Sequence, residues 1–320
     1  MHTLTAMHLF AIVSRVACSS LMGYLGASLH CINDGVATDP ACGSGNFLTE
    51  TYLSLRRLEN ETLSLLHHGQ SVLDIGNPIQ VSIGQFYGIE INDFAVTVAR
   101  TALWIAESQM MKETEDVVHM SLDFLPLRSY ANITEGNALR LDWESVVPKR
   151  ELNYIMGNPP FVGLSMRSKE QQVDMADVFH DNNKAGRLDY VAAWYKKAAQ
   201  YMDNSGIETA FVSTNSIVQG EQVPILWEDL LNNHEIYINF AYRPFQWNSE
   251  AKEKAAVNCI IIGFSKKERP AKIIYESNSM RFVKKINGYL VDYDNIFIHL
   301  RSKPQKGFPK MTQGNKPRHS

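Results

Sequence analysis

Cysteine is scarce in this chain of 320 residues, and its four cysteines show no C-x-x-C pair. The ten histidines also lack an H-x-x-x-H or similar ligand pattern. Paired spacings of this kind mark structural zinc sites and redox motifs. The sequence therefore predicts no metal site and indicates a reducing compartment such as the cytoplasm.

Long uncharged hydrophobic runs, internal repeats and low-complexity segments are also missing. The most apolar stretch, residues 1–35, has no basic n-region, and Arg15 and several serines and glycines interrupt it. Signal peptides and membrane spans need an unbroken apolar segment. We therefore expect no membrane partner and describe 1–35 as an atypical N-terminal segment.

Acidic charge is scarce near the C-terminus. Residues 266–320 hold thirteen Lys or Arg against four Asp or Glu, a net charge of +9, whereas the rest of the chain carries −12. A basic segment suits the phosphate backbone of nucleic acid, but an exposed chain end is basic nearly as often. Both interpretations stay open at this point.

The hydrophobic content of 45% is that of a globular protein, and its pattern alternates between strand-like and helical. Helical periodicity covers Phe94–Met111 and Tyr190–Met202. The expected strands are Gly35–Asp39, Gln85–Ile91, Asn132–Glu135, Leu152–Met156, Glu208–Thr214, Glu235–Tyr242 and Val257–Phe264. This alternation predicts an α/β fold with a mostly parallel seven-stranded sheet, helices on both faces and an antiparallel hairpin at one edge.

The strongest local motif is TDPACGSGNFL at residues 38–48, where an acidic residue ends a strand and a glycine turn leads into a helix near Asn46. Gly43 and Gly45 permit a positive φ and a close approach of the backbone to a ligand. The pattern is not G-x-G-x-x-G, and the next strand-ending acid is Glu90, 45 residues after Gly45. A nicotinamide dinucleotide site is therefore not expected. Glu90 is a candidate for binding ribose hydroxyls or, alternatively, a solvated residue near a helix start.

Two further strand ends carry polar motifs. Asn137 follows the strand at Asn132–Glu135 and is either an adenine-binding residue or a turn residue. The sequence YIMGNPPFVG at 154–163 stops a strand with Asn158, two prolines and Phe161, which form a stiff elbow. Parallel strands open their ligand crevice at their carboxyl ends, so these motifs are expected at one edge of the sheet.

Together these four strand ends resemble the class I S-adenosylmethionine-dependent methyltransferases, and N-P-P-F is typical of those that act on the N6 amine of adenine in DNA. The methyltransferase segment of fused type II restriction-modification enzymes is similar over about residues 36–310. The resemblance implies a Rossmann-like methyltransferase domain at 36–265, S-adenosylmethionine as cofactor, double-stranded DNA as partner and a bacterial or archaeal cytoplasm. Residues 266–320 would begin a basic target-recognition region.

The resemblance also implies roles for individual residues. The target amine would meet Asn158 and Pro159 within the motif that continues through Pro160, and Phe161 would lie against the base. Phe245, between the last two expected strands, would stack on its other face, with Trp247 as the second choice. The residues implied for the cofactor are Asp39, Ala41, Gly43 and Gly45 at the methionine end, Glu90 at the ribose and Asn137 at the adenine.

Three departures from the family pattern leave alternatives open. Residues 1–35 contain nothing like the family's G-x-x-Y-T segment, no nuclease motif is present, and the target-recognition region is short. Endonuclease and recognition parts, or another chain, would then be missing. The alternatives are a catalytically silent chain that binds nucleic acid weakly and, with less support, an N-methyltransferase for protein glutamine or RNA.

Overall fold

The computed structural model describes residues 35–67, 79–119, 132–247, 257–276, 279–299 and 301. In these residues one mixed sheet of nine strands runs in the order β3-β2-β1-β4-β5-β7-β6-β8-β9. The strands are β1 Ala37–Asp39, β2 Phe86–Glu90, β3 Asn132–Glu135, β4 Tyr154–Gly157, β5 Glu208–Thr214, β6 Tyr237–Trp247, β7 Val257–Ser265, β8 Lys272–Glu276 and β9 Ser279–Val283. All seven expected strands are present, and their ends agree within two residues except in β6, which continues to Trp247 and not only to Tyr242.

The first five strands are parallel, as predicted. β1 pairs with β2 on one side and with β4 on the other, so the connections run outward in both directions from β1. β3 then extends the sheet beyond β2, and β5 extends it beyond β4. This reversal of strand order opens a crevice at the carboxyl ends of β1 and β4, where α/β sheets bind ligands.

The antiparallel part differs from the prediction in two ways. β7 pairs antiparallel with both β5 and β6, so the β6–β7 hairpin exists. The sheet does not end there, because β8 pairs parallel with β6, and β9 pairs with β8. The expected count of seven strands and the edge position of the hairpin were therefore wrong. β8 and β9 lie in the basic segment after residue 265, and they are strands because β8 pairs with β6 and β9 pairs with β8.

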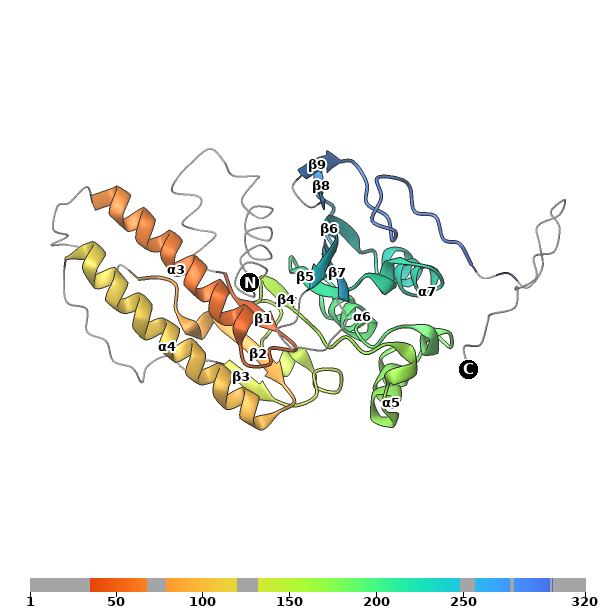
Figure 1. The fold of residues 1–320 in the computed structure, drawn as a ribbon, viewed down its shortest axis with the longest axis horizontal. Helices are drawn as coiled ribbons and strands as arrows, with labels where there is room; N and C mark the ends of the chain where they lie inside the picture. The colour runs from red at the N-terminus through yellow and green to blue at the C-terminus, as the bar shows by residue number, and fades with distance from the viewer. Residues whose placement is uncertain are drawn as a thin grey trace, which may run out of the picture.

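Helices cover both faces of the sheet, as expected (Figure 1). On one face α3 and α4 lie side by side, and on the other are α5, α6 and α7. Each group packs its apolar residues on the strands to form a separate hydrophobic core. The helices are α3 Asn46–His67, α4 Asp93–Val118, α5 Lys169–Val178, α6 Ala192–Tyr201 and α7 Gln222–Glu228. Short 3-10 helices cover Ile83–Gln85, Trp143–Ser145, Leu164–Met166, Ala185–Arg187 and Asn215–Val218, and a π-helical turn covers Asp229–Asn233.

The α3–α4 pair is fastened by buried polar side chains. Arg56 is fully buried, forms an ion pair with Glu59 and donates from Nη2 to Thr114 Oγ1 of α4 at 2.6 Å. Glu59 Oε1 also accepts from the backbone N–H of Gln80 at 2.7 Å. The charges of Arg56 and Glu59 thus compensate each other where water is excluded.

The chain beyond residue 265 contributes to the same core. Ile274 of β8 is buried, as are Ile286 and Leu290 in the segment that follows β9. The boundary at 265 stays a prediction, and residues 1–34 lie outside the described part of the chain. Within that part, no helix is long and apolar enough to cross a membrane.

Candidate functional site

Four parallel strands end at the same edge of the sheet and bring the predicted motifs together. β1 ends at Asp39, β2 at Glu90, β3 at Glu135, and β4 at Gly157, directly before Asn158. Asp39 is in register with Gly88 of β2. The sequence-based expectation that these strand ends lie at one edge of the sheet is therefore confirmed for the backbone.

The glycine turn after β1 is fixed against the end of β2. Gly43 N–H donates to Glu90 Oε2 at 2.9 Å, and Cys42 N–H donates to the Ile89 carbonyl at 3.1 Å. Glu90 Oε1 accepts from Asn92 N–H at 2.9 Å, just before α4. Each Glu90 oxygen thus has one backbone donor, which orients the carboxylate and leaves further lone pairs for ligand hydroxyls.

Both glycines of the turn are required by its geometry. Gly43 and Gly45 have φ angles of +54° and +81°, which L side chains rarely adopt. A Cβ on Gly45 would also lie 2.9 Å from Ala99 Cβ, so α4 can pack closely only against a glycine. Gly45 leads directly into α3, where its carbonyl accepts from Thr49 N–H at 2.8 Å.

Asp39 is a buried carboxyl in this crevice, with 1% of its surface exposed. Its Oδ1 accepts from Ala41 N–H at 2.9 Å. Burial, together with the nearby charge of Glu90, raises the pKa of Asp39 to about 7, although the Ala41 hydrogen bond opposes the shift. A Cβ on Gly157 would collide with Asp39 Oδ1, so the glycine before the N-P-P-F motif makes room for this carboxyl.

Asn137 follows β3 and has both ends of its side chain engaged. Its Oδ1 accepts from Leu139 N–H at 2.9 Å, and its Nδ2 donates to Asp174 of α5 at 3.0 Å. The preceding Gly136 N–H donates to the Glu90 carbonyl at 2.8 Å. Asn137 is therefore held beside the Glu90 strand end, and its oxygen keeps a second lone pair for a donor from a ligand.

The N-P-P-F elbow carries an unsatisfied acceptor. Asn158 is half-buried, Pro159 is buried and Pro160 is exposed. Asn158 Oδ1 is fully buried and has no hydrogen-bond partner among the described residues. Leaving a buried acceptor unpaired costs about 1–3 kcal/mol, and a donor from a ligand or a water molecule removes this cost.

The two candidate aromatic residues border one hydrophobic cluster. Phe161 and Phe245 are both partly buried and pack against the core on the α3–α4 face. Phe245 was expected in the loop between the last two strands, but it lies within β6, in register with Cys259 of β7. Cys259 in turn is in register with Thr214, the last residue of β5, which places Phe245 level with the carboxyl edge of the parallel strands. Trp247 ends β6, and its side chain is outside the described set.

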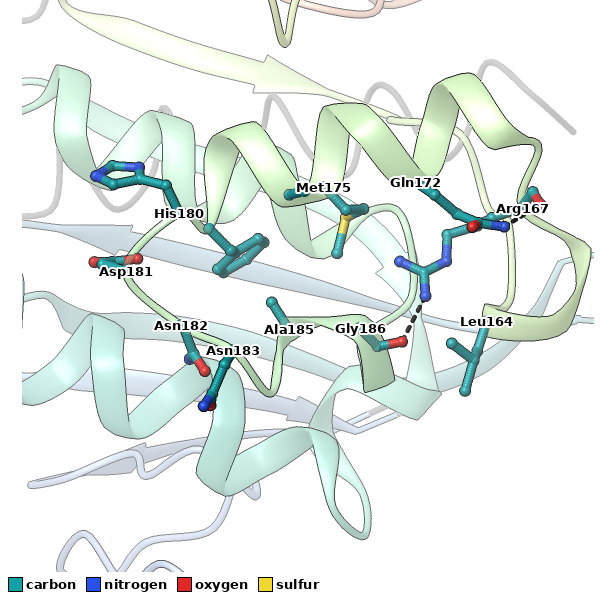
Figure 2. Close-up of a pocket in the computed structure, with 12 residues that line it drawn as sticks. Leu164, Arg167, Gln172, Met175, His180, Asp181, Asn182, Asn183, Ala185 and Gly186 are labelled. Carbon is teal, nitrogen blue, oxygen red and sulfur yellow. Dashed lines mark hydrogen bonds between the residues drawn. The ribbon is translucent and has the colours of Figure 1, made fainter.

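A separate pocket of about 790 Å³ lies between α5 and the loop that leads to Ala185–Arg187 (Figure 2). Arg167 reaches across it and donates to the Gly186 carbonyl at 2.6 Å. None of the residues that the sequence suggested for cofactor or base lines this pocket. The described residues contain no group of His, Cys, Asp and Glu suited to a metal ion.

Sequence reasoning missed the residues behind the crevice. Asp174 is buried at 2% exposure but lies in a helix with no motif around it. Trp194 of α6 donates from Nε1 to the Pro40 carbonyl at 3.0 Å and so holds the turn after β1. No sequence motif marks Asp174 or Trp194, which meet the strand-end turns only in the folded chain.

Comparison with known proteins agrees with this geometry. The family described as MmeI, DNA-methyltransferase domain, matches residues 25–276. DNA methyltransferase A of Bacillus subtilis (strain 168) is 42% identical over 284 residues, which cover 87% of this chain and 32% of that protein. The chain therefore spans about a third of the length of this curated relative.

Solved structures show the same fold. The type IIL restriction-modification enzyme MmeI, solved in complex with DNA, has a TM-score of 0.82 and 43% identity, covering 93% of this chain and 41% of that chain. The type IIG restriction endonuclease BpuSI, at 13% identity and a TM-score of 0.55, covers 87% of this chain and 27% of its own, and shows the fold alone. The class I methyltransferase fold is thus confirmed, and this chain belongs to the MmeI DNA-methyltransferase domain family.

Proposed function

We propose that this chain is the catalytic domain of a DNA methyltransferase of a restriction-modification system, which transfers a methyl group from S-adenosylmethionine to the N6 amine of adenine. The observation that carries the proposal is the buried, unpaired Asn158 Oδ1 at the carboxyl edge of β4. An acceptor kept free at this place suits a substrate N–H donor. The family membership and the relatives named above support the coarser part of the proposal, a DNA methyltransferase of the restriction-modification type.

The residues of the crevice fit S-adenosylmethionine. The Gly43 and Gly45 turn permits close approach of a ligand, and the Asp39 carboxyl suits the cationic methionine end. Glu90 would accept from the ribose hydroxyls, and Asn137 Oδ1 would accept from the adenine amine. When bound, the cofactor supplies an activated methyl group on a sulfonium.

The protein's own contribution is to position and polarise the target amine. The lone pair of the adenine amine is delocalised into the ring, which makes it a poor nucleophile. Asn158 Oδ1 and the Pro159 carbonyl would accept its two hydrogens and favour a pyramidal nitrogen. The two prolines hold both acceptors rigidly, so little reorganisation is needed. No covalent enzyme intermediate is required.

The base must leave the duplex to reach this elbow, which costs a few kcal/mol of stacking energy. Phe161 and Phe245, which border the same cluster, are proposed to offset part of this cost by contact with the extruded base. Sequence recognition is proposed to need further parts or another chain; this chain covers 41% of the MmeI chain.

The first test is calorimetric titration of the purified chain with S-adenosylmethionine, followed by a DNA methylation assay that maps the modified base. Micromolar binding and methylation at adenine N6 are expected. A folded sample that does not bind the cofactor would contradict the proposal and favour a catalytically silent chain.

Replacing Asn158 tests the central residue directly. Asn158→Ala removes the free acceptor, so methyl transfer should fall by at least a hundredfold, while the cofactor affinity stays within about threefold. The matched control is Asn132→Ala, at the amino end of β3, where Nδ2 donates to the Gly84 carbonyl at 2.9 Å. The control should keep wild-type transfer. Full transfer by Asn158→Ala would refute the assigned role.

A further inference from the structure

Asp174 is a buried carboxylate that lies behind the candidate site. Its Oδ1 accepts from Arg140 Nε at 2.7 Å, and its Oδ2 accepts from Tyr190 OH at 2.7 Å and from Asn137 Nδ2 at 3.0 Å. Burial opposes ionisation, but these three hydrogen bonds outweigh it and hold the pKa of Asp174 below its usual value. The side chain is therefore a fixed negative charge with every partner defined.

The first arm of this network sets the orientation of Asn137. If its amide were flipped, Nδ2 would face the Leu139 N–H and the oxygen would face the Asp174 carboxylate, which gives two repulsive contacts. Only the observed orientation satisfies both neighbours. The hydrogen bond to a carboxylate also polarises the amide and strengthens its oxygen as an acceptor.

The second arm reaches the loop after the N-P-P-F motif. Tyr190, whose hydroxyl binds Asp174, donates from its backbone N–H to the Val162 carbonyl at 3.0 Å. The adjacent Asp189 accepts from Leu164 N–H at 3.2 Å and from the Ser216 hydroxyl. The chain directly after Phe161 is thus tied to the same helix-start segment that contacts Asp174.

A third link includes the turn after β1. The rings of Tyr190 and Trp194 pack edge to face, with their centroids 5.2 Å apart. Trp194 Nε1 donates to the Pro40 carbonyl at 3.0 Å. Three strand-end turns, after β1, β3 and β4, therefore rest on one buried support made of Asp174, Tyr190 and Trp194.

We propose that Asp174 is a positioning residue that holds Asn137 and, through Tyr190, the loop after Phe161, so that the cofactor pocket and the target-base pocket form together. The inference rests on the proposed function, because it assigns the adenine end of the cofactor to Asn137. Asp174 itself touches neither ligand in this assignment.

An exchange of the two side chains tests the first arm. Asp174→Asn places an amide against the Asn137 amide, and Asn137→Asp places one carboxylate against another. Each single variant should bind S-adenosylmethionine about tenfold more weakly. The double variant Asn137→Asp/Asp174→Asn restores a carboxylate–amide pair and should recover affinity to within about threefold of wild type. Losses that simply add in the double variant would overturn the proposal.

Unfolding in the absence of cofactor provides an independent readout. In Asn137→Asp the two neighbouring carboxyls should raise the pKa of one of them, so the folded state loses more stability than wild type does as pH rises from about 4 to 7. The double variant should lose this additional pH dependence. Equal pH profiles of Asn137→Asp and wild type would show that the two side chains do not interact as described.

The second arm is tested with Tyr190→Phe, which removes only the hydroxyl. Methyl transfer should fall about tenfold through a higher KM for DNA, while cofactor affinity changes less than in Asp174→Asn. The matched control for Asp174→Asn is Asp229→Asn. It removes a second buried carboxylate, which is bound to Lys196 Nζ at 2.7 Å. It should lower stability but leave cofactor affinity unchanged.

Equal loss of cofactor affinity in Asp229→Asn and Asp174→Asn would contradict a specific positioning role. If wild-type protein bound no S-adenosylmethionine, the proposed function would fail, and the unfolding profiles would still decide whether Asp174 orients Asn137.

Discussion

Asp39 shows how a single residue is tuned by the fold around it. It ends a strand, is buried and lies beside Glu90, and its pKa is raised to about 7. A carboxyl whose pKa is higher in the folded state than in the unfolded chain stabilises the fold fully only below its unfolded pKa. That contribution is lost as pH rises through the folded pKa. The Asp39 carboxyl therefore keeps its proton to a higher pH than an exposed aspartate does.

Asp39→Asn keeps an acceptor for Ala41 N–H but cannot ionise. We expect the unfolding free energy of wild type to fall, relative to this variant, by about 4 kcal/mol between roughly pH 4 and pH 7. Denaturant titrations at several pH values measure the difference. Parallel pH profiles for the two proteins would show that Asp39 is not perturbed by burial.

The α3–α4 pair illustrates the cost of a buried ion pair at the scale of elements. Glu59→Ala would leave the Arg56 guanidinium buried without its partner and would release the backbone of Gln80. We expect a loss of about 3–5 kcal/mol in the free energy of unfolding. The control is Glu61→Ala, an exposed residue of the same helix, which should change stability by less than about 0.5 kcal/mol. Similar losses of unfolding free energy in Glu59→Ala and Glu61→Ala would mean that water reaches the Arg56–Glu59 ion pair.

The elements differ in how well the sequence predicted them. The strand at Glu208–Thr214 was predicted to the residue, because a run of apolar residues bounded by polar ones is visible without tertiary information. β8 and β9 were missed, since their stability comes from pairing, of β8 with β6 and of β9 with β8, and not from their own pattern. The same holds for the site. Motifs at strand ends pointed to Asp39, Glu90 and Asn158, but Asp174 lies 37 residues from Asn137 and meets it only in the folded chain.

At the scale of the whole molecule, the residues before and after the expected boundary at 265 contribute to the same hydrophobic core, the one that contains α6 and α7. Ile286, beyond the expected boundary at 265, is buried against the cluster that contains α6 and α7. Ile286→Ala should lower the free energy of unfolding by about 2–4 kcal/mol without splitting the transition. Ile298→Ala, at a side chain that is 68% exposed, is the control and should have little effect. A separate early transition for the C-terminal part would indicate an independent unit.

The position of β7 between β5 and β6 has a consequence for synthesis on the ribosome. β6 leaves the ribosome before β7, although β7 lies between β5 and β6 in the sheet. Neither the free edge of β5 nor β6 can pair with β7 until β7 has emerged. Until about residue 265 has left the exit tunnel, the nascent chain carries an apolar strand and an unpaired sheet edge at the same time, a state prone to misassembly. A translation pause that keeps β7 inside the exit tunnel should therefore lower the yield of folded protein, whereas a pause after residue 265 has left the tunnel should not.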